Sequence, residues 1–246
     1  LGNTFMIWGW NFLPQILMAL LLAAIFTNTR NKVKGQGFFK VVFYMPNIIT
    51  AATITILFNA FFSYPIGPVN DILVSLGLRD AAYQFSVDKS ASRIIVAFIQ
   101  FWTWYGNTMI ILISGVLGIS PDIYEAAEID GANGIQTFFK ITIPCIRSIM
   151  VYVLVTSLIG GLNMFDIPQL FIDIRCNNAG LTTNMYIRNQ AFFGSYMYNR
   201  AAAASVIMFI IIVALSALLF YFMRDRDEAK LKKLKKMELR AAKKGL

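Results

Sequence analysis

Five long stretches without a single charged residue dominate this sequence. They cover residues 1–29, 41–70, 94–121, 148–165 and 201–223. An α-helix crosses the hydrocarbon core of a bilayer in about 20 residues, so each stretch is long enough to span it, the fourth being the shortest. Backbone polar groups inside lipid must be satisfied by helices or closed barrels, and these stretches lack the strict alternation of barrel strands. We therefore predict an all-α, polytopic membrane protein with five transmembrane helices.

The composition excludes most soluble proteins. Hydrophobic residues make up 57% of the 246 residues and charged residues only 14%, whereas an average soluble domain is about 25% charged. The chain has no histidine, which is the usual zinc ligand and the usual general base near neutral pH. Its two cysteines cannot build a disulfide framework. We predict no catalytic residue, metal site or cofactor in this chain, and we do not expect an enzyme.

The basic residues indicate how the chain is oriented. Most of the 22 Lys and Arg residues fall in the connections 28–40 and 118–147 and in the segment 224–246. Because Lys and Arg are enriched in cytoplasmic connections, we predict that these segments are cytoplasmic and that residue 1 lies on the outer side. Cys145 and Cys176 then lie on opposite sides and cannot pair. The chain divides into a membrane domain at 1–223, which includes the cytoplasmic loop 118–147, and a basic cytoplasmic tail at 224–246.

Two segments outside the spans have interfacial character. Residues 69–77 of the outer connection have the pattern of a short amphipathic helix that ends at Gly77. The tail is interpreted as a solvated topology anchor, with a basic helix on anionic lipid as the alternative. Nucleic-acid binding is not expected for a membrane-tethered tail without aromatic residues. Within the first stretch, Pro14 predicts a kink.

The cytoplasmic loop 118–147 carries clear helix-boundary signals. Ser120 is a favourable N-cap, Pro121 suits the first helical position, and Gly131 permits a sharp stop. A second short helix is expected to follow as far as Pro144. On composition alone, this loop could equally be an ordinary interfacial helix between two spans.

One spacing in this loop is specific. Glu125-Ala126-Ala127 is followed after three residues by Gly131, and after a further nine by Ile141-Thr142-Ile143-Pro144. This pattern resembles the EAA loop of binding-protein-dependent ABC importer permeases, which is also cytoplasmic. Ile143 stands where that family more often has Leu.

The resemblance extends over nearly the whole chain. Ile119-Ser120-Pro121, Tyr124 and the run 129–133 are similar to the sugar branch of the family. Within that branch the chain resembles the first of two paired permeases, the maltose-permease-like subunit. Its start at Leu1 looks like the family's second span, which implies a further N-terminal span. The Gly-Gly-Gly-Pro stretch common in the family's outer loop is absent here.

The resemblance implies the type I ABC importer permease fold and a transport function. In such importers two permease subunits form a heterodimer across a bacterial or archaeal plasma membrane. Two ATPase subunits, which bind ATP and Mg, drive transport, and an extracellular solute-binding protein delivers a mono- or oligosaccharide. The present chain would be a multi-pass subunit with a cytoplasmic C-terminus and no chemistry of its own.

In this family the EAA loop is a coupling helix that docks on the ATPase. The resemblance assigns that role to Glu125, Ala126, Ala127, Asp130, Gly131, Ile141 and Pro144. Glu125 would present its charge to a basic groove, and Gly131 would set the angle between the two short helices.

Polar side chains within the charge-free stretches are candidates for the substrate pathway. Gln100, Trp104 and Asn107, continued by Ile111 and Ser114, recur at spacings of three and four residues and so share one helix face. Polar groups are costly in hydrocarbon, so this face should look into the protein or a water-filled cavity. The alternative is that the amides join helices. Further candidates are Asn59, Asn163, Phe165 and Asp166.

Two other function classes stay open as alternatives. An ion-coupled secondary transporter would need charged residues within its spans and often has an internal repeat, whereas the five stretches carry no charge and no clear repeat. A membrane scaffold would have no need for the EAA spacing. Within the ABC class, the solute could instead be a phosphorylated polyol or a peptide.

Overall fold

The computed structural model describes residues 1–28, 33–176, 180–193 and 196–223, and every regular element in these ranges is helical. The tail at 224–246 and the basic residues Arg30 and Lys32 lie outside the described residues. The elements are α1 (Gly2–Thr27), α2 (Gln36–Ile48), α3 (Ala51–Phe61), α4 (Pro68–Ser75), α5 (Lys89–Leu117), α6 (Pro121–Ile129), α7 (Gly134–Thr137), η1 (Phe138–Thr142), α8 (Ile143–Cys145), α9 (Arg147–Leu162), α10 (Asp166–Phe171), η2 (Ile174–Cys176), α11 (Thr183–Phe192) and α12 (Tyr198–Met223).

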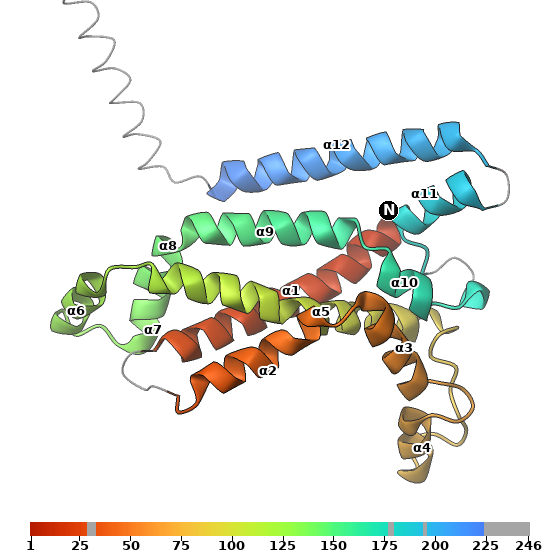
Figure 1. The fold of residues 1–246 in the computed structure, drawn as a ribbon, viewed down its shortest axis with the longest axis horizontal. Coiled ribbons are helices and arrows are strands. Elements are labelled where there is room, and N and C mark those ends of the chain that lie inside the picture. The colour runs from red at the N-terminus through yellow and green to blue at the C-terminus, as the bar shows by residue number, and fades with distance from the viewer. Residues whose placement is uncertain (29–32, 177–179, 194–195, 224–246) are drawn as a thin grey trace, which may run out of the picture.

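Four long helices form the body of the molecule. The helices α1, α5, α9 and α12 run roughly alongside one another (Figure 1). Helices α1, α5 and α12 are each long and apolar enough to cross a membrane, and so is the stretch Arg147–Phe171, which contains α9 and α10. They correspond to four of the five predicted spans. Helix α1 contains Pro14 and continues through it as a single element.

The predicted span at 41–70 is wrong as a single straight helix. Helices α2 and α3 meet at an angle of 91°. Ile49 and Thr50 between them have extended backbone, and the Thr50 hydroxyl accepts a hydrogen bond from the Thr53 N–H, which starts a new helix. Pro46 near the end of α2 removes a backbone donor. An uninterrupted apolar stretch therefore forms two helices with a sharp bend between them rather than one straight helix.

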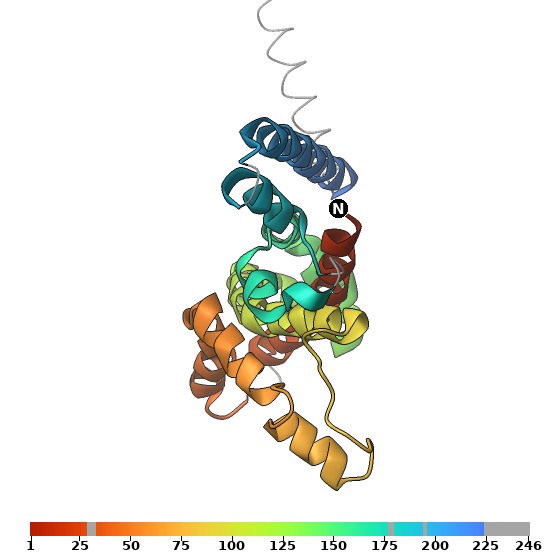
Figure 2. The ribbon, with the colours of Figure 1, turned by 90° about the vertical axis from the view of Figure 1, so that its right-hand side faces the viewer.

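The connections gather at the two ends of the body, as the alternation of spans requires. The loop α6–α8, the start of α2 and the end of α12 lie at one end, while the N-terminus, α3, α4, α10 and α11 lie at the other (Figure 1). Viewed from that second end, α12 and α4 lie on opposite sides of the body (Figure 2). Cys145 and Cys176 are both free, as predicted.

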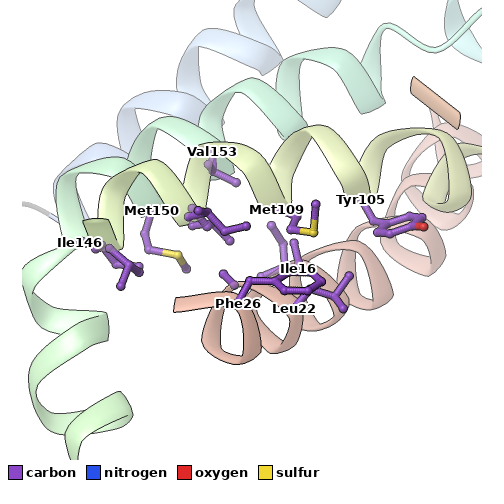
Figure 3. Close-up of a cluster of buried hydrophobic side chains, with 13 residues drawn as sticks. Ile16, Leu22, Phe26, Tyr105, Met109, Ile146, Met150 and Val153 are labelled. Atoms are coloured by element: carbon purple, nitrogen blue, oxygen red, sulfur yellow. The ribbon is translucent and has the colours of Figure 1, made fainter. Parts of the chain in front are cut away.

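The largest core cluster fills the space between α1, α5 and α9 (Figure 3). Its members include Ile16, Leu22, Phe26, Tyr105, Met109, Met150 and Val153. A second close contact joins α5 to α2, where a Cβ added at Gly106 would overlap the Phe43 carbonyl oxygen. Small residues allow such backbone approaches between membrane helices. The core thus holds α1, α5 and α9 as one unit.

The connection 62–88, which is predicted to lie on the outer side, contains a short helix and a hydrogen-bonded loop. Helix α4 confirms the short helix predicted at 69–77, and Gly77 after it has a φ of +67°. Asn70 is 2% exposed, and its amide donates to the carbonyl oxygens of Ser63 and Tyr83 at 2.8 and 3.1 Å. The Tyr83 N–H donates back to Asn70 Oδ1 at 2.8 Å. These bonds fix α4 against its own loop.

Helix α12 has little of its surface inside this chain. It packs against α9 and α11, and only 6% of its apolar window is buried. Leu158 and Leu162 of α9 meet Met208 of α12 in a small cluster. Ile212, Leu215 and Leu219 pack against this cluster. Most other large apolar side chains of α12 are exposed, as they would be toward lipid tails or a neighbouring membrane subunit.

Candidate functional site

A polar cavity opens between α1, α5 and α9. Its volume is about 130 Å³. The lining residues are Asn11, Gln15, Gln100, Trp104, Asn107, Thr108, Ile111, Tyr152, Val153, Thr156, Ser157, Gly160 and Gly161. Several polar side chains therefore line a cavity among three apolar helices, where polar groups are costly and often mark functional sites.

One side of the cavity is closed by a hydrogen-bond network through Gln15. Its amide donates to Thr108 Oγ1 at 2.8 Å, and its carbonyl oxygen accepts from Ser157 Oγ at 3.4 Å. Thr108 in turn donates to the Trp104 carbonyl oxygen at 3.2 Å. Gln15 is 4% exposed, so a single buried amide joins α1, α5 and α9.

Three other amides in the cavity have open hydrogen-bonding capacity. Among the described residues, Asn11, Gln100 and Asn107 have no side-chain hydrogen-bond partner. Asn11 is 3% and Gln100 6% exposed. An unpaired buried amide costs several kcal/mol in an apolar medium, about 2–7. These groups must therefore meet water or a polar ligand inside the cavity.

The sequence prediction for this face is partly realised. Gln100, Trp104, Asn107 and Ile111 all line the cavity, so the alternative that the two amides join helices finds no hydrogen bond to support it. Ser114 lies elsewhere: it lines a separate surface hollow and donates to its own helix at the Ile110 carbonyl oxygen.

Sequence reasoning missed the cavity residues that come from the other two helices. Asn11 and Gln15 lie four residues apart on α1, and Tyr152, Thr156 and Ser157 lie on α9. The α1 pair could have been found from sequence, because Asn11 and Gln15 are the only amides inside α1 after its first turn and their spacing of four puts them on one helix face.

The remaining predicted pathway residues do not line this cavity. Asn59 donates to the Leu170 carbonyl oxygen at 2.9 Å, and the Asn163 carbonyl oxygen accepts from Asn184 at 2.7 Å. The Phe165 ring lies 5.0 Å from the Arg188 guanidinium carbon. Asp166 is the first residue of α10. Asn163 lines a separate pocket between α9, α11 and α12, together with Asn184.

The loop at the opposite end is built as two short helices around a tight stop. Helix α6 starts at Pro121 after Ser120, whose side chain makes no cap hydrogen bond, contrary to its predicted capping role. Gly131 follows α6 with a φ of +74°, a conformation that favours glycine. Asn133 and Gln136 then form a reciprocal capping box that starts α7.

The predicted coupling residues differ in exposure. Glu125, Ala126, Asp130 and Gly131 are exposed, as is Pro144 after the π-helical turn η1, whereas Ala127 is 6% exposed and Ile141 is half-buried. Large apolar side chains stand beside them on the surface. Ile123, Ile129, Ile135 and Phe139 are 42%, 87%, 73% and 62% exposed. The exposed surface of the loop therefore consists of large apolar side chains with acidic residues between them.

Comparison with known proteins identifies the family. The family described as the binding-protein-dependent transport system inner membrane component matches residues 16–233. The chain belongs to this family. It is therefore an inner-membrane permease component of an ABC transporter, with several helices long and apolar enough to cross the membrane.

Several characterised permeases are similar to this one. The lactose transport system permease protein LacF of Rhizobium radiobacter is 31% identical over 86% of this permease and 71% of its own length. The arabinooligosaccharides transport system permease protein AraP of Bacillus subtilis (strain 168) is 30% identical over 87% of this permease and 67% of its own length.

Solved structures share the fold. A chain of a bacterial ABC transporter for the import of the acidic polysaccharide alginate matches with a TM-score of 0.79 and 25% identity. The match covers 91% of this permease and 77% of that chain. A second structure of the alginate transporter, in complex with an alginate pentasaccharide-bound periplasmic protein, gives the same TM-score at 26% identity. The fold is that of an ABC importer permease.

Proposed function

We propose that this permease carries a carbohydrate through the membrane within an ATP-driven importer that is supplied by an external binding protein. The observation that carries the proposal is the set of unpaired amides of Asn11, Gln100 and Asn107 around the cavity between three spans. The orientation inferred from the basic residues puts the loop α6–α8 in the cytoplasm.

The chemistry of the cavity suits a sugar. Side-chain amides both donate and accept hydrogen bonds, as sugar hydroxyls do. Trp104 and Tyr152 line the same cavity and are 46% and 57% exposed, so their rings are available to the apolar faces of a sugar ring. Among the residues that the structure describes, no acidic or basic side chain lines the cavity, which favours an uncharged hydroxyl-rich solute at this point.

The names of the similar proteins support the same class. The names of three similar proteins state transport of lactose, of arabinooligosaccharides and of alginate. These solutes differ in size and charge, and hydroxyl-rich rings are what they share. Carbohydrate is therefore the substrate class that both the cavity and the relatives favour.

A second permease would complete the pathway. Ligand pockets usually have volumes of about 300–1,000 Å³, whereas this cavity has about 130 Å³. Trp104 and Tyr152 leave about half of their surfaces uncovered. We infer that a paired permease closes over this side, and that neither chain alone encloses the sugar.

The exposed loop provides the surface for an ATPase. Ile129 and Ile135 are among its most exposed side chains, and solvent-exposed apolar groups gathered in one place are typical of docking sites. Glu125 stands exposed on the same helix. We propose that α6 is the coupling helix, that two partner ATPases bind ATP and Mg, and that this chain hydrolyses nothing.

Uptake by the complete importer tests the cavity. The full chain is expressed with the genes that neighbour it, and uptake of labelled lactose, an arabinooligosaccharide and an alginate oligosaccharide is measured. Asn107→Ala and Gln100→Ala should each raise the half-saturating concentration of the transported sugar about tenfold, as expected for one or two lost polar contacts. Ser114→Ala, on the same helix but outside the cavity, is the matched control.

The result also separates the competing functions. Uptake that needs ATP and co-purifies with an ATPase and a second permease supports the importer. Uptake that follows an ion gradient without ATP would overturn it in favour of a secondary transporter. Equal uptake by Asn107→Ala, Gln100→Ala and wild type would contradict the assignment of the cavity.

A further inference from the structure

Two of the links between the coupling helix α6 and the rest of the molecule lead to the cavity helices α5 and α9. A linker of three residues, 118–120, joins it covalently to α5. A hydrogen bond of 3.2 Å between the hydroxyls of Tyr124 and Thr142 joins it to the turn that leads into α9. Beyond these links, α6 packs extensively against no other described element. The Tyr124–Thr142 bond therefore links α6 directly to the turn that leads into α9.

The direction of the hydrogen bond follows from its surroundings. Thr142 is 5% exposed, and its hydroxyl donates to the Thr137 carbonyl oxygen at 3.4 Å. A hydroxyl has one proton to donate, so Tyr124 is the donor to Thr142. Both hydrogen-bonding functions of the buried Thr142 hydroxyl are then used, one toward α6 and one toward the end of α7.

The chain between α6 and α9 is irregular. After α7 comes the five-residue π-helical turn η1, closed by a bond from the Ile143 N–H to the Phe138 carbonyl oxygen. The short α8 follows and contains Pro144, which has no backbone N–H. Isolated π-helical turns are rare and occur frequently at functional sites. Such broken helical pieces transmit a displacement less directly than one continuous helix.

Both α5 and α9 line the cavity, so motion of α6 must reach both of them. We propose that the Tyr124–Thr142 hydrogen bond is a latch that makes α9 follow the coupling helix together with α5. Tyr124 and Thr142 are accordingly positioning residues: they lie outside the cavity and act through the helices that they join. This inference rests on the proposed coupling function of α6.

Removal of single hydroxyls tests the latch. Tyr124→Phe and Thr142→Val are introduced separately into the full chain. Each variant is purified together with its partner subunits and reconstituted in vesicles. ATP hydrolysis and sugar uptake are then measured in the same vesicles. Each variant should lower the sugar taken up per ATP hydrolysed by about fivefold, the size expected for one hydrogen bond. Subunit composition and basal ATP hydrolysis should stay unchanged.

Three further variants test whether the effect comes from this one hydrogen bond. The double variant should be no worse than either single one, because both remove the same bond. Thr142→Ser keeps the hydroxyl and should restore wild-type coupling. Tyr186→Phe, at the opposite end on α11, should have no effect.

Each contrary outcome overturns the latch in a recognisable way. Normal uptake per ATP in both single variants, or losses that add in the double variant, would reject it while leaving the proposed function intact. Loss of the ATPase from purified Tyr124→Phe would assign Tyr124 to docking instead. A wild-type complex that hydrolyses ATP without moving sugar would reject the proposed function itself.

Discussion

Gln15 of α1 donates a 2.8 Å hydrogen bond to Thr108 of α5, across 93 positions of sequence, at the wall of the polar cavity. The same amide accepts from Ser157 of α9. These hydrogen bonds therefore hold α1, α5 and α9 together at one depth, where lipid alone would not fix their positions along one another. The network both stabilises the fold and fixes one wall of the cavity.

Gln15→Leu should lower the free energy of unfolding by about 1 kcal/mol, because buried hydrogen bonds between membrane helices contribute roughly 0.6–1.7 kcal/mol. Thermal unfolding of the purified protein in detergent measures the change. Gln100→Leu is the matched control, since Gln100 lines the same cavity without a side-chain partner among the described residues. A control that loses as much stability as Gln15→Leu would argue against the network.

Two adjacent glycines on α9 should respond in opposite ways. A Cβ at Gly160 meets nothing within 4 Å, whereas a Cβ at Gly161 would overlap the Trp8 ring. Gly160→Ala should therefore keep or raise stability, by up to about 1 kcal/mol, while it narrows the cavity and weakens uptake. Gly161→Ala should cost about 1–3 kcal/mol. Thermal unfolding and uptake of both variants check the pair; full uptake by Gly160→Ala would show that solute does not pass here.

Glu125→Lys should prevent capture of the ATPase without affecting insertion. The side chain is exposed on α6, and reversal of an interface charge puts like charges opposite each other, which weakens binding about tenfold or more. Affinity purification followed by mass spectrometry measures what is recovered. Asp71→Lys on α4 makes the same charge change at the other end and should keep the ATPase. Equal recovery in both variants would contradict the coupling assignment.

Labelling of cysteine tests the orientation. Cys145 is exposed and Cys176 is 2% exposed, so a membrane-impermeant maleimide should modify Cys145 alone. The positive-inside pattern predicts labelling in inside-out vesicles and none in intact cells. Asp71→Cys in a background without Cys145 should show the reverse. Labelling of Cys145 from outside would invert the topology and remove α6 from reach of a cytoplasmic ATPase.

The cap of α5 should give a pH-dependent stability. Asp88 accepts hydrogen bonds from the Ala91 and Ser90 N–H groups at 2.7 and 3.0 Å. The Ala91 N–H, followed by the Tyr83 hydroxyl, holds the pKa of Asp88 below its usual 3.8. Asp88→Ala should cost about 1 kcal/mol near neutral pH.

The sign of this effect follows from the lowered pKa. A carboxyl group whose pKa is lower in the folded state stabilises the fold above its unfolded pKa, and this contribution is lost as the pH falls through the folded value. Wild type and Asp88→Ala should therefore converge in stability between about pH 4 and the lowered pKa. Unfolding temperatures measured at pH 7 and pH 3 test this, with Asp80→Ala, which caps no helix, as control. If the difference in stability between wild type and Asp88→Ala stays constant across that pH range, the Asp88 carboxylate is not the source of the difference.

The helix boundaries in the loop 118–147 could be predicted from sequence in some detail because their signals are local. A stop at Gly131 needs only a residue that accepts positive φ, and the spacing from Glu125 to Pro144 lies within a single loop. The Tyr124–Thr142 bond could not be foreseen, since it depends on the path of the π-helical turn between them. Ser120 marked the helix start correctly, but its side chain does not cap it.

The sequence indicated only those cavity residues that α5 contributes. Periodicity along α5 put Gln100, Trp104 and Asn107 on one face, yet no sequence pattern stated which helices would face them. Asn11 of α1 and Tyr152 of α9 come from distant parts of the chain. Their convergence depends on how the core cluster around Met109 orients the three helices.

The sequence by itself determined the number and approximate limits of the apolar segments and the separation of the connections into two sets. The reason is that a bilayer sets a length and forbids unpaired backbone groups, and both conditions act on each segment separately. Tertiary structure alone decided that the second segment bends by 91° at Ile49 and Thr50. It also decided which polar side chains meet inside the membrane, because helix rotation and close approach at residues such as Gly106 are set by side-chain packing between segments.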